Sequence, residues 1–83
     1  MKLAIDIGNT FIKCAVFNKR KIIYRASIQE SIELLKTIKK YTLSQIIISS
    51  VVPNKSKTFI SFLQKHTNAP IETINYKKTN LNL

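Results

Sequence analysis

A short stretch near the amino terminus, residues 5–10 with the sequence Ile-Asp-Ile-Gly-Asn-Thr, carries residue types that bind phosphate, and Lys13 follows three residues later. Asn9 and Thr10 have short side chains that donate hydrogen bonds, and backbone N–H groups in a turn can do the same. Lys13 adds a compact positive charge. Asp6 is the only aspartate of the sequence, and a carboxylate beside phosphate groups commonly holds magnesium. The stretch therefore predicts a hairpin that cradles phosphate.

The same residue types also build ordinary turns. Asp and Asn side chains bond to nearby backbone N–H groups. Gly8 permits a positive φ and lets a ligand come close to the backbone. Residue types alone leave both interpretations open, a structural turn and a nucleotide site.

Length and composition predict one small globular domain, because the chain has 83 residues of which 45% are hydrophobic. No apolar run is long enough to span a bilayer, and the first residues lack the pattern of a signal peptide, so we expect a cytoplasmic protein. The single cysteine, Cys14, and the single histidine, His66, form neither a disulfide nor a metal cluster. We expect Cys14 to be buried and inert in a strand, and His66 to lie on the surface at a helix end.

The formal net charge of +10 raises the alternative of a nucleic-acid or other polyanion partner. The lysines are scattered, however, and only short pairs such as Lys39-Lys40 and Lys77-Lys78 occur. This spread favours a general composition bias over a dedicated nucleic-acid surface.

The first third of the chain predicts three antiparallel strands, residues 1–7, 11–17 and 22–28, with a hairpin turn at 18–21. In the second strand, odd-numbered residues from Phe11 to Phe17, Lys13 among them, share one face, and Ile12, Cys14 and Val16 share the other. We expect the first strand to lie nearest the middle of the sheet.

Residues 27–30 have the spacing of a capping box and predict a helix that begins there and ends near Tyr41. Its predicted apolar stripe comprises Ile32, Leu35 and Ile38, with Leu34 beside them. Residues 45–49 are apolar on both faces, which is typical of a strand covered by helices on both sides. Asn54 looks like the cap of a second helix ending at His66, with a face formed by Phe59, Phe62, Leu63 and His66.

A final strand is predicted at residues 71–75, and residues 76–83 carry no periodicity. Right-handed crossovers then give a sheet in which the strands have the order 3-2-1-4-5. A ligand crevice is expected at the carboxyl end of the first strand, beside the loop after the fourth. Residues 6–10 and Ser49-Ser50 would meet there, and this convergence favours the nucleotide site.

Two segments resemble type III pantothenate kinases. Residues 6–13, Asp-Ile-Gly-Asn-Thr-Phe-Ile-Lys, are similar to the Asp-x-Gly-Asn-Thr-x-x-Lys phosphate motif of that family, and residues 47–53 are similar to its Ser-Ser-Val-Val-Pro segment. The family belongs to the actin, sugar kinase and Hsp70 superfamily. The resemblance implies an α/β fold, a ribonuclease H-like (actin-like ATPase) half-domain with a mixed five-stranded sheet.

The resemblance also implies a reaction, the ATP-dependent phosphorylation of pantothenate that begins coenzyme A biosynthesis. It implies ATP, magnesium and a monovalent cation, potassium or ammonium, as cofactors, pantothenate as substrate, and a homodimer. Asp6 would hold magnesium through water, and Lys13 would neutralise charge as the phosphoryl group moves. The implied ATP-binding residues are Asp6, Ile7, Gly8, Asn9, Thr10, Phe11, Ile12 and Lys13.

One departure from the family stands out. Family members have a second, substrate-binding domain and a Gly-x-Asp-Arg segment whose aspartate is the base and whose arginine binds the substrate carboxylate; this sequence has no such segment. Its other acids, Glu30, Glu33 and Glu72, are not placed to be that base. We therefore expect residues 1–83 to be a single, truncated N-terminal ATPase-type domain with no catalytic residue and no turnover alone. A basic module that binds nucleic acid or acidic lipid, and a regulatory relative without catalysis, are the alternatives.

Overall fold

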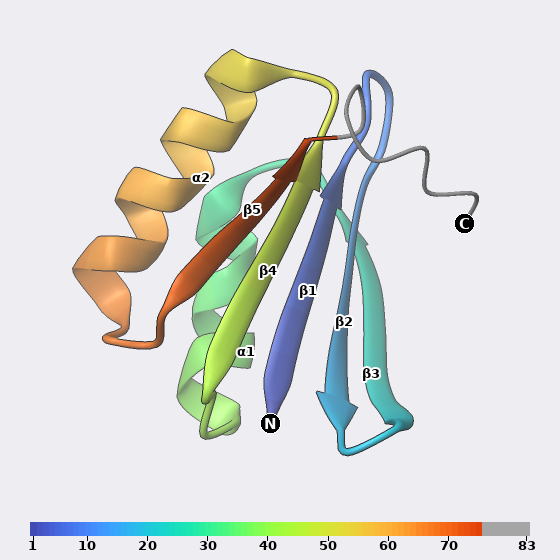
Figure 1. The fold of residues 1–83 in the computed structure, drawn as a ribbon, viewed down its shortest axis with the longest axis vertical. Coiled ribbons are helices and arrows are strands. Elements are labelled where there is room, and N and C mark those ends of the chain that lie inside the picture. The colour runs from blue at the N-terminus through green and yellow to red at the C-terminus, as the bar shows by residue number, and fades with distance from the viewer. Residues whose placement is uncertain (76–83) are drawn as a thin grey trace.

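A computed structural model describes residues 1–75; the predicted aperiodic segment 76–83 lies outside them. Five strands form one mixed sheet of order β3-β2-β1-β4-β5 (Figure 1). Its first three strands are an antiparallel meander, and β4 and β5 run parallel to β1. The predicted order is confirmed. The strands are β1 (Lys2–Ile7), β2 (Ile12–Asn18), β3 (Lys21–Ile28), β4 (Gln45–Ser50) and β5 (Ile71–Asn75).

Both connections between parallel strands carry helices, and all of them lie on one face of the sheet (Figure 1). The β3–β4 connection holds a 3-10 turn, η1 (Ser31–Leu34), and α1 (Leu35–Lys40), and the β4–β5 connection holds α2 (Pro53–His66). The prediction that β4 is covered on both sides is wrong. Because both right-handed crossovers advance across the sheet in the same direction, they place their helices on the same face.

The core lies between this face and the helices. Alternate strand residues point into it, which confirms the predicted alternation of β2. Helix α2 contributes Phe59 and Leu63, which lie four positions apart on its inner face. None of the helices within residues 1–75 has the length and apolar character needed to cross a bilayer. The buried apolar residues are Leu3, Ile5, Ile7, Ile12, Cys14, Val16, Ile28, Leu34, Ile46, Ile48, Phe59 and Leu63.

The first helical segment begins later than its sequence predicts. Ser27 still pairs with Lys13 in β3, so the ladder extends to Ile28 and the predicted capping box does not form at residues 27–30. Instead, the Glu33 carboxylate accepts hydrogen bonds from the backbone N–H groups of Gln29 (2.6 Å) and Glu30 (2.8 Å). A capping box therefore forms three residues further along, at residues 30–33.

The apolar stripe of this segment also differs from the prediction. Leu34 is fully buried, whereas Ile32 is 56% exposed. Residues 31–34 form a 3-10 turn with about three residues per turn, so the stripe inferred for an α-helix does not apply to them. Further along, Thr37 is buried, and Ile38 packs against the core.

The helix α2 starts two residues earlier than predicted. Val52, and not the predicted Asn54, is the capping residue, and Pro53 is the first residue of the helix. Proline suits this position because the missing N–H would have no partner within the helix. The helix ends at His66 as predicted, and the exposed His66 ring lies 4.5 Å from the ring of Phe62.

Candidate functional site

The turn between β1 and β2 is held closed by its own backbone. The Gly8 N–H donates to the Phe11 carbonyl at 2.9 Å. A Cβ atom added at Gly8 would lie 3.0 Å from that same oxygen, closer than side chains normally come. Gly8 does not use the positive φ that its residue type permits. Its lack of a side chain is needed because two segments of backbone approach each other closely.

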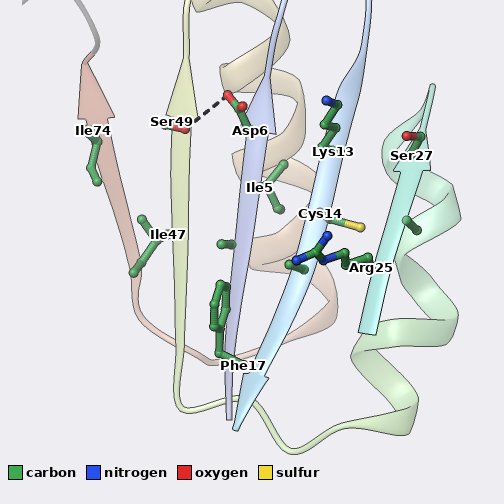
Figure 2. A pocket seen from close by; sticks show the side chains of 13 residues that line it. Ile5, Asp6, Lys13, Cys14, Phe17, Arg25, Ser27, Ile47, Ser49 and Ile74 are labelled. Carbon is green, nitrogen blue, oxygen red and sulfur yellow. Dashed lines mark hydrogen bonds between the residues drawn. The ribbon is translucent and has the colours of Figure 1, made fainter. Parts of the chain in front are cut away.

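Asp6, Lys13 and Ser49 lie side by side on three neighbouring strands. Asp6 in β1 is in register with Lys13 in β2 and with Ser49 in β4. The Ser49 hydroxyl donates to Asp6 Oδ1 at 3.3 Å (Figure 2). All three side chains point away from the helices, because their strand positions alternate with the buried ones. The expected meeting of Asp6 with the segment after β4 therefore occurs through Ser49.

Ser50 has a different place. Its hydroxyl accepts a hydrogen bond from the Val52 N–H at 2.9 Å and lies 3.0 Å from the Val52 carbonyl. The N–H of Val51, between these two residues, donates to the Ile7 carbonyl at 3.2 Å. Ser50 thus shapes the bend into α2, and the segment after β4 is tied to β1 just before the Gly8 turn.

The predicted ATP-binding residues divide by burial. Ile7 and Ile12 are buried beneath the helices, so from these two only backbone atoms could reach a ligand at the turn. The side chains of Asn9, Thr10 and Phe11 are exposed at the turn. The sequence predicted that the second strand begins at Phe11, but Phe11 lies just before β2 and is 66% exposed.

A hollow of about 600 Å³ extends from this site over the helix-free face of the sheet (Figure 2). One end has the polar side chains of Asp6, Lys13, Ser27 and Ser49, and the middle is apolar. Small residues at the centre of the sheet leave the space open. The apolar lining side chains include Ala4, Ala15, Phe17, Ile47 and Ile74.

Sequence reasoning did not single out Ser27 or Arg25 for this region. The polar row consists of Lys13, Asp6 and Ser49, and Ser27 continues it because it is in register with Lys13. Arg25 is in register with Ala15, two residues further along β2. Figure 2 shows the Arg25 side chain reaching from β3 over β2. The alternation of the third predicted strand, aligned with that of the second, was the signal that could have found both residues.

The donor set around Asp6 is compatible with magnesium. Within residues 1–75, no three His, Cys, Asp or Glu side chains gather to form a full protein cage for a metal. Magnesium does not require one, since it usually keeps several waters and binds one or two carboxylates together with substrate phosphates. Asp6, exposed and beside the Ser49 hydroxyl and Lys13, offers that kind of partial ligand set.

Comparison with known proteins gives one family. The model of the type III pantothenate kinase family matches residues 2–83, nearly the whole chain. The chain belongs to this family. No curated protein matches it. Members of this family are pantothenate kinases, phosphotransferases of coenzyme A biosynthesis that use ATP as phosphoryl donor.

For a type III pantothenate kinase, the position of the polar row is informative. The row lies at the carboxyl end of β1 and β4, where open α/β sheets place their ligands. The two motif segments, residues 6–13 and 47–53, come from different parts of the chain and meet at this end of the sheet. The structure therefore gives both motifs one common location.

Proposed function

We propose that this end of the sheet binds the phosphate groups of ATP for the phosphorylation of pantothenate. The observation that carries the proposal is the row formed by Lys13, Asp6 and Ser49 beside the tight Gly8 turn. It combines one positive charge, one carboxylate and one hydroxyl with the backbone of a turn, which are the groups used to hold nucleotide phosphates.

Each group has a separate task in the proposal. Lys13 neutralises negative charge on the phosphate oxygens, and the Asn9 and Thr10 side chains hold the phosphates in position. Asp6 binds magnesium through water, and the bound ion supplies further positive charge to the phosphates. Ser49 orients the Asp6 carboxylate through its hydrogen bond. These tasks suit phosphoryl transfer, which depends mainly on positioning and electrostatic stabilisation.

The proposal does not include a base for the pantothenate hydroxyl. Of the four acidic residues in the sequence, Asp6 alone lies in the row. Glu33 binds the backbone at the start of η1, and Glu72 accepts a hydrogen bond from the Gln45 side-chain amide at 2.9 Å. We therefore propose that this chain contributes the phosphate-binding domain of a two-domain kinase and that residues 1–83 alone do not turn over.

Calorimetric titration with magnesium-ATP tests the site. We expect weak binding to the unmodified chain and no measurable binding after Asp6→Ala or Lys13→Ala. Lys2→Ala is the matched control, because Lys2 is an exposed lysine at the opposite end of the same β1 strand, and it should leave binding unchanged. Binding that persists in both site variants would refute this location.

A second measurement tests the missing base. The chain is incubated with magnesium, ATP and pantothenate, and ADP release is followed. We expect no pantothenate-dependent release. Turnover by the isolated chain would show that residues 1–83 contain a working base, while leaving the phosphate site itself supported by the calorimetric result.

A further inference from the structure

The outer edge of β3 is an exposed strand with large apolar side chains. Within residues 1–75, β3 pairs with β2 on one side and lies at the edge of the sheet on the other. Ile22 and Ile23 are each 41% exposed, and Tyr24 is 37% exposed. An edge strand presents backbone N–H and C=O groups along its free side, and natural proteins usually protect it with proline, charge or a cover. Residues 22–24 contain neither a proline nor a charged side chain.

Positive charge surrounds the same edge. Lys19 and Arg20 form the hairpin loop that leads into it, and Lys21 is the first residue of β3; all three are exposed. On the helix side, the Tyr24 ring lies 6.1 Å from the Tyr41 ring, which brings the end of α1 beside β3. Residues 39 and 40 at that end are both lysines, and the Lys40 ammonium lies 5.5 Å from the Tyr41 ring.

The four acidic side chains of the sequence lie elsewhere. Glu30 and Glu33 follow the far end of β3, at the start of the helical connection. Asp6 is near the carboxyl end of the central strand β1, and Glu72 is on β5 at the opposite edge of the sheet. Within the described residues 1–75, the hairpin end of β3 therefore has a local excess of positive charge and no carboxylate side chain to balance it.

We propose that this edge, residues 21–25 of β3, docks an extended acidic segment of a partner protein as an added strand. Main-chain hydrogen bonds supply affinity in this mode of recognition, and side chains on alternate positions supply specificity. Because of the extra residue Ile23, Ile22 is in register with Phe17 on the helix-free face and Tyr24 with Val16 on the helix side, so apolar residues of the partner would pack on Ile22 from one face and on Tyr24 from the other. Its carboxylates would face the cations of the hairpin and of the α1 end. The proposal is independent of the ATP site, which lies at the other end of the sheet.

Charge argues against a second copy of this chain as the occupant. Antiparallel pairing of two β3 edges centred on Ile23 would place Lys21 of each copy opposite Arg25 of the other, and directly opposed like charges destabilise a strand pair. The register with β2 also shifts at this point, since Phe17 pairs with Ile22 and Val16 with Tyr24, so Ile23 is an extra residue. Such a bulge twists the strand and discourages long, flat pairing between edges, while a short partner strand can still pair.

The test uses the full chain and a fluorescent, capped peptide of alternating valine and threonine with glutamates at both ends. Fluorescence anisotropy measures its binding at low salt. Two matched probes accompany it, one with lysines in place of the glutamates and one acidic peptide methylated on alternate backbone nitrogens. We expect each change to weaken binding by about tenfold or more, because the first reverses the charge and the second removes the strand hydrogen bonds.

Charge-reversal variants locate the site. Arg20→Glu combined with Lys21→Glu should weaken acidic-peptide binding by about tenfold. Lys55→Glu combined with Lys57→Glu changes the net charge equally at exposed positions of α2 and should leave binding unchanged. Thermal unfolding of both double variants verifies that they are folded.

Four outcomes would overturn the proposal. Absence of binding to the acidic peptide would do so, and so would equal binding of its methylated form, which would indicate charge attraction without strand pairing. Displacement of the peptide by single-stranded DNA of mixed sequence at lower concentration would indicate a nucleic-acid surface instead. A dimer in sedimentation that the hairpin substitutions dissociate would indicate that a second copy occupies the edge.

Discussion

Lys19 has a backbone conformation that its residue type disfavours. Its φ is 59°, and among residues 1–75 no other non-glycine residue has a positive φ. Asn18 and Lys21 pair across the ends of β2 and β3, so Lys19 and Arg20 form a two-residue hairpin loop. Such loops need a positive φ to match the twist of the strands, which is why glycine is favoured there. The sequence showed the hairpin but not the strain, because Lys19 is not a typical turn residue.

Replacing Lys19 by glycine should therefore stabilise the fold. The left-handed conformation costs a side-chain-bearing residue about 1–2 kcal/mol, and the greater backbone freedom of glycine offsets about 0.5–1 kcal/mol of the gain. We expect Lys19→Gly to raise the free energy of unfolding by roughly 0.5–1 kcal/mol in urea titration. Arg20→Gly, at the neighbouring position without a positive φ, is the control and should give no gain. An equal rise in both variants would mean that backbone strain at Lys19 is not the cause.

At the scale of elements, the order of the strands was predictable and the helix details were not. Alternating apolar residues located the strands, and the preference for right-handed crossovers fixed their order. The capping box at residues 27–30 failed because Ser27 already had a partner in the sheet, Lys13, and a tertiary contact outweighs a local spacing. The side of the sheet covered by helices followed from the direction of both crossovers, a consequence that the apolar run of β4 concealed.

The entry to η1 depends on the charge of Glu33. Hydrogen bonds from the N–H groups of Glu30 and then Gln29 hold the pKa of the Glu33 carboxyl below its ordinary value. Because the folded state prefers the charged form, this contribution to stability is present above the ordinary carboxyl pKa. It is lost as the pH falls through the lowered pKa. Glu33→Gln should thus lower the free energy of unfolding near about pH 7 but not near about pH 2. Urea titrations at both pH values measure this, and an equal difference at both would contradict the role of charge.

The candidate site, like the secondary-structure elements, was predictable only in part from the sequence. Asp6, Gly8 and Lys13 form a compact sequence motif, so residue types and spacing sufficed to find them. The contact between Asp6 and Ser49 joins residues 43 positions apart and became predictable only through the strand order. Arg25 escaped notice because its place depends on the register of β3 against β2, which a bulge alters.

At the scale of the whole molecule, the main feature is that the helices cover only one face of the sheet. Ile47 and Ile48 are adjacent residues of β4 with identical side chains, yet Ile48 is 1% exposed in the core while Ile47 lines the open hollow. Burial of apolar area and close packing stabilise the folded state, so the two positions should differ strongly in their contribution.

We expect Ile48→Ala to reduce the free energy of unfolding by about 2–5 kcal/mol, the usual range for a buried isoleucine. Ile47→Ala should cost about 1 kcal/mol or less, because the side chain already contacts solvent on the open face. Urea unfolding of the two variants against the unmodified chain measures both values. Equal losses would show that another surface covers the open face in solution.

The central position of β1 also sets the order in which the fold can assemble on the ribosome. β1 is made first, and β2 and β3 can complete the meander once residue 28 has emerged. The other edge of β1 must wait for β4, which begins at Gln45, and the apolar face of the meander must wait for α1 and α2. During synthesis, the nascent chain therefore passes through a three-stranded stage with an open central edge and an uncovered apolar face, the stage at which chaperones would bind and aggregation would begin.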